Sequence, residues 1–299
     1  MRILWYNKLS KLLPFVEQLA ILYPEYEFVV KNQKKSFTEF PSKNTDFYVT
    51  FAGSKASRPN IRCTTAFRML QSRIRNLCEQ SNKIHVILEA GRINRKNISV
   101  SIGDIGSWGD YGSLIERKGR RFDFRVAPIS DKKNGCVLFC GQVPTDAQIT
   151  VPDYNKWLQE TLFYLKISSK NPVVYRPHPK LSRNDKLFHE RVCKQLKIDI
   201  CDKKTLLESF EKARVVVAMN SNSLVDALKN GIPISCLGGK GSSFVEHLSQ
   251  TNVRDIDRLI LPPQEKIVRT FERMTHLEYT PEEIGAGLGV MELITQYSK

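Results

Sequence analysis

The sequence predicts an α/β protein of two domains, each built on a doubly wound, mostly parallel sheet. Three observations predict it: a length of 299 residues, an alternation of apolar runs with amphipathic segments, and a Pro-, Gly- and charge-rich stretch near 126–135. This length suits two medium domains better than one oversized core. We expect Rossmann-like domains at 1–130 and 131–277, facing across a cleft, and a C-terminal helix at 278–299 that packs back toward the first domain.

The first half alternates strands and helices less regularly than the second. Apolar runs predict strands at 2–6, 26–30, 46–51 and 84–91. Amphipathic segments predict helices at 11–24 and 66–80, and a glycine-rich loop follows at 101–113. The pattern again indicates an α/β unit.

The second half has the clearer rhythm. Strands are expected at 136–141, 172–178, 198–201, 215–220 and 232–237, and helices at 153–168, 184–197, 204–213 and 221–231. Strict alternation of strand and helix is typical of a parallel sheet. The last segment opens with Thr-Pro-Glu-Glu at 280–283, a common way to begin a helix.

Positive charge is concentrated in the first half. The chain carries a net charge of +15, of which residues 1–135 contribute +12, with 24 Lys and Arg against 12 Asp and Glu. The remaining residues contribute only +3. This asymmetry suggests that a polyanion docks on the N-terminal half.

Cysteine usage and the N-terminus both favour a cytoplasmic protein. The seven cysteines form no CxxC pair and no zinc-finger pattern, which suits a reducing compartment. The chain begins directly with a strand, without a signal peptide, and no apolar run approaches the ~18–20 residues of a membrane helix. We expect no stable membrane insertion.

Three groups of residues follow the expected strands of the second half, at the edge where parallel sheets bind ligands. They are Gly141 and Gln142, then Arg176 and His178, then Asn220, Ser221, Asn222 and Ser223. The last group opens a helix, where backbone N–H groups attract phosphate. Singly, these features also fit a turn, a strand end and an ordinary N-cap. Jointly they predict a site for a nucleotide phosphate, with His178 held stiffly between two prolines.

These motifs resemble those of bacterial capsule polysaccharide glycosyltransferases, most closely the Kdo (3-deoxy-manno-octulosonate) transferases and more distantly the GT-B sialyltransferases. "GQVPTDAQI" (141–149), "VVYRPHP" (173–179) and "VVAMNSNSLVDALKNGIPI" (216–234) follow the order of that family's motifs. The resemblance implies a GT-B-like fold, a histidine-proline motif at His178 and a serine motif at Ser221 and Ser223. It extends loosely to the C-terminal "YTPEEIGAG".

The resemblance also implies a catalytic base in the N-terminal domain. Glu89-Ala90-Gly91 matches the family's acidic-acidic-glycine motif, although Ala90 replaces the second acid. Asp104 and Asp110, in the glycine-rich loop, are rival bases, and as turn aspartates they also have a plain structural explanation. We expect a metal-independent mechanism without a cofactor, in which a UDP- or CMP-sugar is the donor substrate.

The acceptor is predicted from the basic first half. Lys and Arg interleaved with aromatic residues suit a row of phosphates and an unpaired base, so the expected acceptor is a hydroxymethylated pyrimidine, such as 5-hydroxymethylcytosine, in bacteriophage DNA. The residues expected to contact DNA are Arg58, Arg68, Arg73, Arg75, Arg92, Arg95, Lys118, Arg120 and Arg121. The alternative is a surface glycan or glycolipid, as for capsule and lipopolysaccharide enzymes.

Two further classes stay open. A sugar-nucleotide epimerase uses the same two-domain fold, but its substrate does not explain a basic N-terminal half. A non-catalytic DNA-binding protein explains the charge, but it has no use for His178 and the serine cluster.

Overall fold

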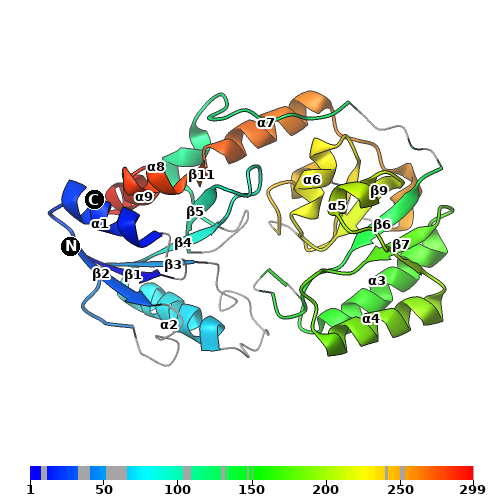
Figure 1. Cartoon of the computed structure of the whole chain (residues 1–299), viewed down its shortest axis with the longest axis horizontal. Helices are drawn as coiled ribbons and strands as arrows, with labels where there is room; N and C mark the ends of the chain where they lie inside the picture. Colours follow the sequence, from blue (N-terminus) through cyan, green and yellow to red (C-terminus); the bar gives the residue numbers. More distant parts are fainter. Residues whose placement is uncertain are drawn as a thin grey trace. The chain divides into compact units, whose positions relative to one another are not determined.

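The computed structural model describes residues 1–7, 12–32, 41–51, 66–103, 109–128, 132, 134–146, 148–149, 151–239, 242–249 and 253–298, without the side chains of 66–69 and 71–72. The chain divides into two compact units, each with its own sheet (Figure 1). Unit 1 comprises Met1–Phe122 and Glu272–Lys299, and unit 2 comprises Asp123–Phe271. No helix within the described residues is both long and apolar enough to cross a membrane.

The sheet of unit 1 has the strand order β11-β5-β4-β3-β1-β2. Its strands are β1 (Arg2–Asn7), β2 (Glu27–Asn32), β3 (Phe47–Phe51), β4 (Ile84–Ala90), β5 (Ile98–Ile102) and β11 (Glu278–Tyr279). β1 to β4 pair in parallel, while β5 runs antiparallel to β4, and β11 antiparallel to β5. The sequence analysis did not predict β5 or β11, and β11, with two residues, is too short to give a periodic pattern.

Helices cover both faces of this sheet (Figure 1): α2 lies on one face, and α1, α8 and α9 lie on the other. Their bounds are α1 Leu13–Leu22, α2 Ala66–Ser81, α8 Pro281–Gly285 and α9 Val290–Tyr297, with a 3-10 turn η4 at Gly112–Glu116. Leu4 and Tyr6 of β1 pack with Leu70 and Ile74 of α2 in one buried cluster. The single C-terminal helix predicted is two helices, because Gly287 and Gly289 have φ of +92° and +73° between them.

The sheet of unit 2 is all parallel, in the order β10-β9-β6-β7-β8. Its strands are β6 (Cys136–Cys140), β7 (Val173–Arg176), β8 (Asp199–Ile200), β9 (Ala213–Ala218) and β10 (Ile234–Cys236). From β6 the chain moves outward through β7 to β8, then returns to the other side for β9 and β10. The switch point of this doubly wound sheet therefore lies between β6 and β9.

Four helices of unit 2 were predicted, and their ends differ from the predicted ones by up to three residues. They are α3 (Tyr154–Ser168), α4 (Arg183–Leu196), α5 (Leu206–Phe210) and α6 (Ser223–Lys229), followed by 3-10 turns η5 (Glu246–Leu248) and η6 (Val253–Arg258). Asp153 and Ser182 cap α3 and α4 by accepting backbone N–H groups. Helix α7 (Gln264–Thr275), which the sequence did not predict, contains the boundary between the units.

Candidate functional site

The three loops predicted to bind a phosphate all lie at the carboxyl edge of the sheet in unit 2. They follow β6, β7 and β9, three adjacent strands that include the switch point. Position 141 requires glycine because the Tyr175 ring of the neighbouring strand packs against its backbone. A Cβ there would lie 2.9 Å from Cε2 of Tyr175. The fold thus brings the predicted residues of unit 2 to one edge.

Gln142 and Asn220 join the loops after β6 and β9. The Gln142 side-chain amide donates to Asn220 Oδ1 at 2.7 Å, and the Asn220 backbone N–H donates to Gln142 Oε1 at 3.2 Å. Both residues are buried, at 6% and 3% exposure. We predicted that they contact the nucleotide; in the structure, these hydrogen bonds hold the two loops together across the switch point.

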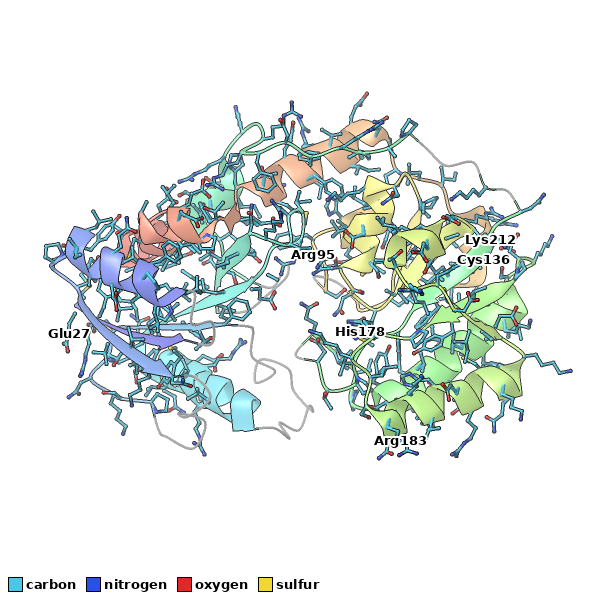
Figure 2. All side chains as sticks on the ribbon, in the orientation of Figure 1. Glu27, Arg95, Cys136, His178, Arg183 and Lys212 are labelled. Atoms are coloured by element: carbon cyan, nitrogen blue, oxygen red, sulfur yellow. The ribbon has the colours of Figure 1, made fainter. Side chains whose placement is uncertain are left out.

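His178 lies two residues beyond β7 and is half-buried (Figure 2). The backbone N–H of Lys180 donates to Nδ1 at 3.1 Å, so the proton of the neutral ring is on Nε2. Burial lowers the pKa of His178 below its ordinary value, and Asp146 opposes this effect while Lys180 adds to it. His178 is therefore a neutral ring at pH 7 whose Nε2–H is a hydrogen-bond donor.

Asp146 is a residue of this edge that the sequence analysis did not select. It accepts the Gln148 backbone N–H at 2.9 Å, which shapes the loop after β6, and its charge acts on the His178 ring. Asp146 lies in "VPTDAQ", the loop that follows Gly141 and Gln142. Only the pairing of β6 with β7 shows that this loop lies beside His178.

Arg176 does not reach toward a ligand in this structure. Its guanidinium donates to the Lys203 carbonyl at 2.8 Å and to Ser209 Oγ at 2.6 Å, which fixes the loop after β8. These contacts show what holds the Arg176 side chain in this structure, and its binding to a phosphate stays a prediction.

The serine motif is divided between the surface and the core. Ser221 and Asn222 are half-buried, and Ser221 Oγ accepts the Ser223 backbone N–H at 3.2 Å. Ser223 is buried, at 6% exposure, and its hydroxyl lies against the Cys140 thiol, whose pKa burial raises to about 12. The two predicted serines thus differ in exposure, and ligand binding by either of them stays a prediction.

In unit 1, Glu89 lies at the end of β4, as predicted for the base. Its carboxylate forms an ion pair with Arg92, Nη2 to Oε2 at 2.9 Å, and Arg92 also donates to Ser99 Oγ at 2.9 Å. Arg92 was predicted to contact DNA; in the structure it is buried, at 7% exposure, and its guanidinium pairs with Glu89. The ion pair fixes the position of the Glu89 carboxylate.

Glu278, which the sequence analysis missed, holds the loop that carries Arg92. Its buried carboxylate accepts the backbone N–H groups of Arg92, Ile93 and Asn94, at 2.5, 2.7 and 2.9 Å. Gly91 allows this, since a Cβ there would lie 2.7 Å from Glu278 Oε2. The glycine of the acidic motif is therefore explained by a residue 187 positions later, which only the pairing of β11 with β5 brings near.

The two rival bases have different outcomes. Asp104 lies outside the described residues. Asp110 is described, and its carboxylate accepts the Gly112 backbone N–H at 2.9 Å and the Tyr297 hydroxyl. These contacts give Asp110 a role in joining η4 to helix α9.

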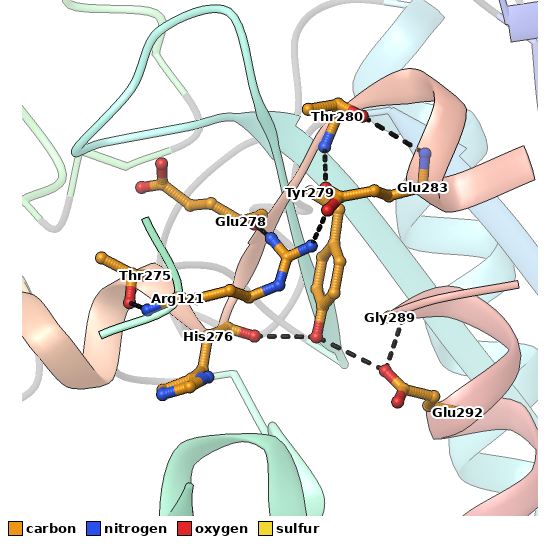
Figure 3. Close-up of polar contacts among 9 residues, drawn as sticks. All are labelled: Arg121, Thr275, His276, Glu278, Tyr279, Thr280, Glu283, Gly289 and Glu292. Atoms are coloured by element: carbon orange, nitrogen blue, oxygen red, sulfur yellow. Dashed lines mark hydrogen bonds and ion pairs between the residues drawn. The ribbon is translucent and has the colours of Figure 1, made fainter. Parts of the chain in front are cut away.

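Arg121 is the centre of a polar cluster in unit 1 (Figure 3). Its guanidinium lies 4.3 Å from the centre of the Tyr279 ring, pairs with Glu283 and donates to the Glu278 carbonyl at 2.5 Å. Glu283 in turn forms a capping box with Thr280 at the start of α8. Arg121 was predicted to bind DNA; in the structure its side chain joins Tyr279, the Glu278 carbonyl and Glu283, and so holds the C-terminal segment.

The other basic residues predicted to contact DNA differ in exposure. Arg75 pairs with Glu79 at 2.7 Å, and Arg73 is half-buried. Arg95, Lys118 and Arg120 are exposed. Arg58 and the side chain of Arg68 lie outside the described part of the chain.

The sequence contains one Asp-x-Asp triplet, a pattern that can bind a metal ion: Asp255-Ile256-Asp257, in η6. The Asp257 carboxylate accepts hydrogen bonds from Ser169 Oγ, the Lys170 backbone N–H and Asn171 Nδ2 at 2.6 to 2.9 Å. These bonds give Asp257 a structural role. In the described ranges, no three His, Cys, Asp or Glu side chains gather in a group suited to a metal ion.

Comparison with known proteins shows the fold. No protein-family model matches the sequence, and no curated protein is similar to it. Among solved structures, the KpsC beta Kdo 2,7 transferase of Thermosulfurimonas dismutans aligns over 97% of this chain and 98% of its own, with a TM-score of 0.51 and 14% identity. The beta Kdo 2,4 transferase of the same organism aligns over the same shares, with a TM-score of 0.47 and 10% identity.

A third similar structure is TarM, at 12% identity and a TM-score of 0.42 over 94% of this chain and 55% of that chain. Of these three structures, the beta Kdo 2,7 transferase has a TM-score above 0.5. This chain therefore has the predicted GT-B fold, and its resemblance to capsule polysaccharide glycosyltransferases is confirmed at the level of fold.

Proposed function

We propose that this chain is a glycosyltransferase that moves a sugar from a nucleotide-sugar donor to a hydroxyl of an anionic surface glycan or glycolipid. The observation that carries the proposal is His178, a neutral Nε2–H donor fixed at the carboxyl edge of a parallel sheet. Its setting supports the proposal too, since the fold is that of a protein described as a beta Kdo 2,7 transferase.

Unit 2 binds the donor in this proposal. His178 Nε2–H donates to a phosphate oxygen of the nucleotide, and Ser221 and Asn222 contact the same phosphate or the sugar. Gln142 and Asn220 keep the loops in place. When the bond between the sugar carbon and the phosphate oxygen breaks, the nucleotide leaves with the electron pair, and the His178 donor stabilises the charge.

Unit 1 activates the acceptor. The Glu89 carboxylate takes the proton of the acceptor hydroxyl as its oxygen forms a bond with the sugar carbon. Arg92, held by Ser99 and by the Glu278-bound loop, positions Glu89. This assignment follows from the motif resemblance and from the position of Glu89 near the end of β4, where Arg92 holds its carboxylate.

An anionic glycan or glycolipid explains the basic unit 1 better than DNA does. Of the nine residues expected on DNA, Arg75, Arg92 and Arg121 are ion-paired within unit 1. The exposed Arg95, Lys118 and Arg120 suit a few acidic groups on an acceptor. Hydroxymethylated DNA stays the second candidate, favoured by the +12 charge of residues 1–135.

The test is a transfer reaction with UDP- and CMP-sugars and, separately, an anionic oligosaccharide, a glycolipid or 5-hydroxymethylcytosine DNA. We expect a glycan product heavier by one sugar, detected by mass spectrometry and lost in His178→Ala. Leu187→Ala, on the exposed side of α4, is the matched control and should retain activity. A glycosylated nucleoside supports DNA instead, and an isomerised sugar nucleotide without any acceptor product supports an epimerase.

A further inference from the structure

A cavity of about 710 Å³ lies at the amino edge of the sheet in unit 2, at the end of the strands opposite His178. Cys136 is the first residue of β6 and Lys212 directly precedes β9, and the two lie side by side, away from His178 (Figure 2). Six side chains of the lining matter for its chemistry: Lys132, Cys136, Val174, Asp199, Glu211 and Lys212. The cavity is as large as a typical small-molecule pocket.

The floor of this cavity is a half-buried part of the sheet. Val137 of β6 and Val173 of β7 pack in the core against α3 and α4. Because side chains alternate along a strand, Cys136 and Val174 point to the other face of the sheet. Both are only half-buried, although a parallel sheet normally has both faces covered. The cavity therefore offers a ligand an apolar surface.

Two lysines lie at one end of this floor. The Lys132 ammonium donates to the Phe210 carbonyl at 2.7 Å, and the Lys212 carbonyl accepts the Cys136 backbone N–H at 2.8 Å. Burial raises the pKa of the Cys136 thiol, and the charges of Lys132 and Lys212 oppose this effect, as expected of cations near it. Glu211, next to Lys212, leaves this end with a net charge of +1.

The opposite end of the floor carries a carboxylate. Asp199 of β8 pairs in register with Val174 of β7, and its side chain lines the cavity. Strands β9, β6, β7 and β8 are adjacent in that order. Neighbouring strands lie about 4.8 Å apart, so the backbones of Lys212 and Asp199 are about 14 Å apart across the strands.

The charges of the lining balance, although the whole chain carries +15. A polyanion therefore has no preference for this cavity, and a ligand with two separated, opposite charges suits it better. The ammonium and the carboxylate of a single amino acid are bonded to the same carbon and lie too close together to reach both ends. Each further residue adds about 3.5 Å, so a dipeptide or tripeptide has the right reach.

We propose that this cavity binds a short zwitterionic peptide with free ends and an apolar side chain. The terminal carboxylate of the peptide contacts Lys132 and Lys212, and its terminal ammonium contacts Asp199. Its apolar side chain lies on Val174 and Cys136. This binding does not depend on the donor site or on sugar transfer.

The test is calorimetry of the full chain with the dipeptide Ala-Leu. Leucine, N-acetyl-Ala-Leu and Ala-Leu amide are the comparison ligands: leucine is too short, the acetyl group removes the ammonium, and the amide removes the carboxylate. We expect Ala-Leu to bind most tightly, with a loss of up to about five-fold for each blocked end, as for an exposed ion pair. Ala-Leu should also slow the alkylation of Cys136 by N-ethylmaleimide, measured by mass spectrometry, and N-acetyl-Ala-Leu amide should not.

Matched variants test the two ends separately. Asp199→Asn should weaken binding of Ala-Leu and leave that of N-acetyl-Ala-Leu unchanged. Lys212→Gln should weaken binding of N-acetyl-Ala-Leu and leave that of Ala-Leu amide unchanged. The controls Asp202→Asn and Lys203→Gln make the same charge changes on exposed residues at the opposite edge of the sheet, and should leave all affinities unchanged. His178→Ala should still bind Ala-Leu, which separates this cavity from the donor site.

Three outcomes overturn the proposal. The first is equal affinity for Ala-Leu and its blocked forms, or no slowing of Cys136 alkylation at the highest soluble concentration of Ala-Leu. The second is an equal loss in a variant and its control. In the third, N-acetyl-Ala-Leu binds as tightly as Ala-Leu and Lys212→Gln alone weakens both, which makes the cavity a site for small anions. Circular dichroism melts confirm that each variant is folded.

Discussion

The Glu89 carboxylate and the Arg92 guanidinium form an ion pair at 2.9 Å, with 17% and 8% of their side chains exposed. Glu89 of β4 and Glu278 of β11 both pair with Ser99 of β5. The sheet register therefore places Glu89, Ser99 and Glu278 side by side on three adjacent strands. Glu278 binds the loop that carries Arg92, and Arg92 binds Ser99 and Glu89. The proposed base is thus positioned by a residue from the far end of the chain.

Glu89→Gln tests the base. The amide oxygen still accepts a hydrogen bond from Arg92, so we expect the fold and donor affinity to be preserved, while the transfer rate falls roughly 100-fold or more. Initial rates with saturating donor measure the effect, and calorimetry measures donor binding. Asp110→Asn is the control variant. We expect it to retain activity, because the Asp110 carboxylate accepts hydrogen bonds from Gly112 and Tyr297. The assignment is wrong if Asp110→Asn is the inactive variant and Glu89→Gln is active.

Arg92→Leu tests the positioning network. Removing one partner of a buried ion pair leaves the other charge without compensation, so we expect a loss of about 3 kcal/mol in the free energy of unfolding. Urea denaturation measures it. Arg92→Lys restores the charge but cannot contact Ser99 and Glu89 at once as the guanidinium does. It should recover part of the stability, with a lower transfer rate than the unaltered chain. A loss well under 1 kcal/mol in Arg92→Leu means that the pair is not a structural element of unit 1.

The pH dependence of nucleotide binding tests the state of His178. Burial lowers its pKa, so the ring is neutral and donates through Nε2–H at pH 7 and above. We expect nucleotide affinity to stay flat between about pH 7 and 8.5, and to fall roughly 10- to 100-fold in His178→Ala because a hydrogen bond to a charged oxygen is lost. Affinity that declines steadily as pH rises through this range indicates a protonated imidazole instead.

The sequence predicted the parallel sheet of unit 2 well, because β6, β7 and β9 are long apolar runs separated by helices with polar caps. The sequence analysis also predicted that His178 and Ser221 lie at the same edge of this sheet, since the carboxyl ends of parallel strands share one edge. It did not predict the partners of Arg176, Arg92 or Arg121. Such partners depend on strand register and on a C-terminal segment that returns to unit 1, and neither leaves a local pattern in the sequence.

Two buried histidines should make stability depend on pH. Burial lowers the pKa of His85 to about 3, with Arg75 adding to the effect, and burial lowers that of His189 to about 4 against the opposing charge of Asp185. Below the ordinary histidine pKa, the unfolded chain binds more protons than the folded chain, so stability falls as pH is lowered from 7 toward 4.

Each histidine should contribute a loss of about 2 kcal/mol at pH 5, measured by urea unfolding at a series of pH values. His85→Gln, which replaces the ring that bonds Thr50, should remove about half of the slope assigned to the pair. An unchanged slope in this variant would show that the carboxylates, and not His85, set the pH dependence.

Arg121→Ala separates a structural arginine from one that binds the acceptor. The side chain stacks on Tyr279, pairs with Glu283 and donates to the Glu278 carbonyl, so its removal should lower the free energy of unfolding of the chain by about 2 kcal/mol. Lys118→Ala, three residues earlier and exposed, should leave stability unchanged and weaken binding of an anionic acceptor. Thermal melts and acceptor titrations on both variants distinguish the two roles. If Arg121→Ala melts like the unaltered chain and loses acceptor affinity, the residue belongs to the acceptor site, and the C-terminal segment is held by Arg117 and its partner Glu292 instead.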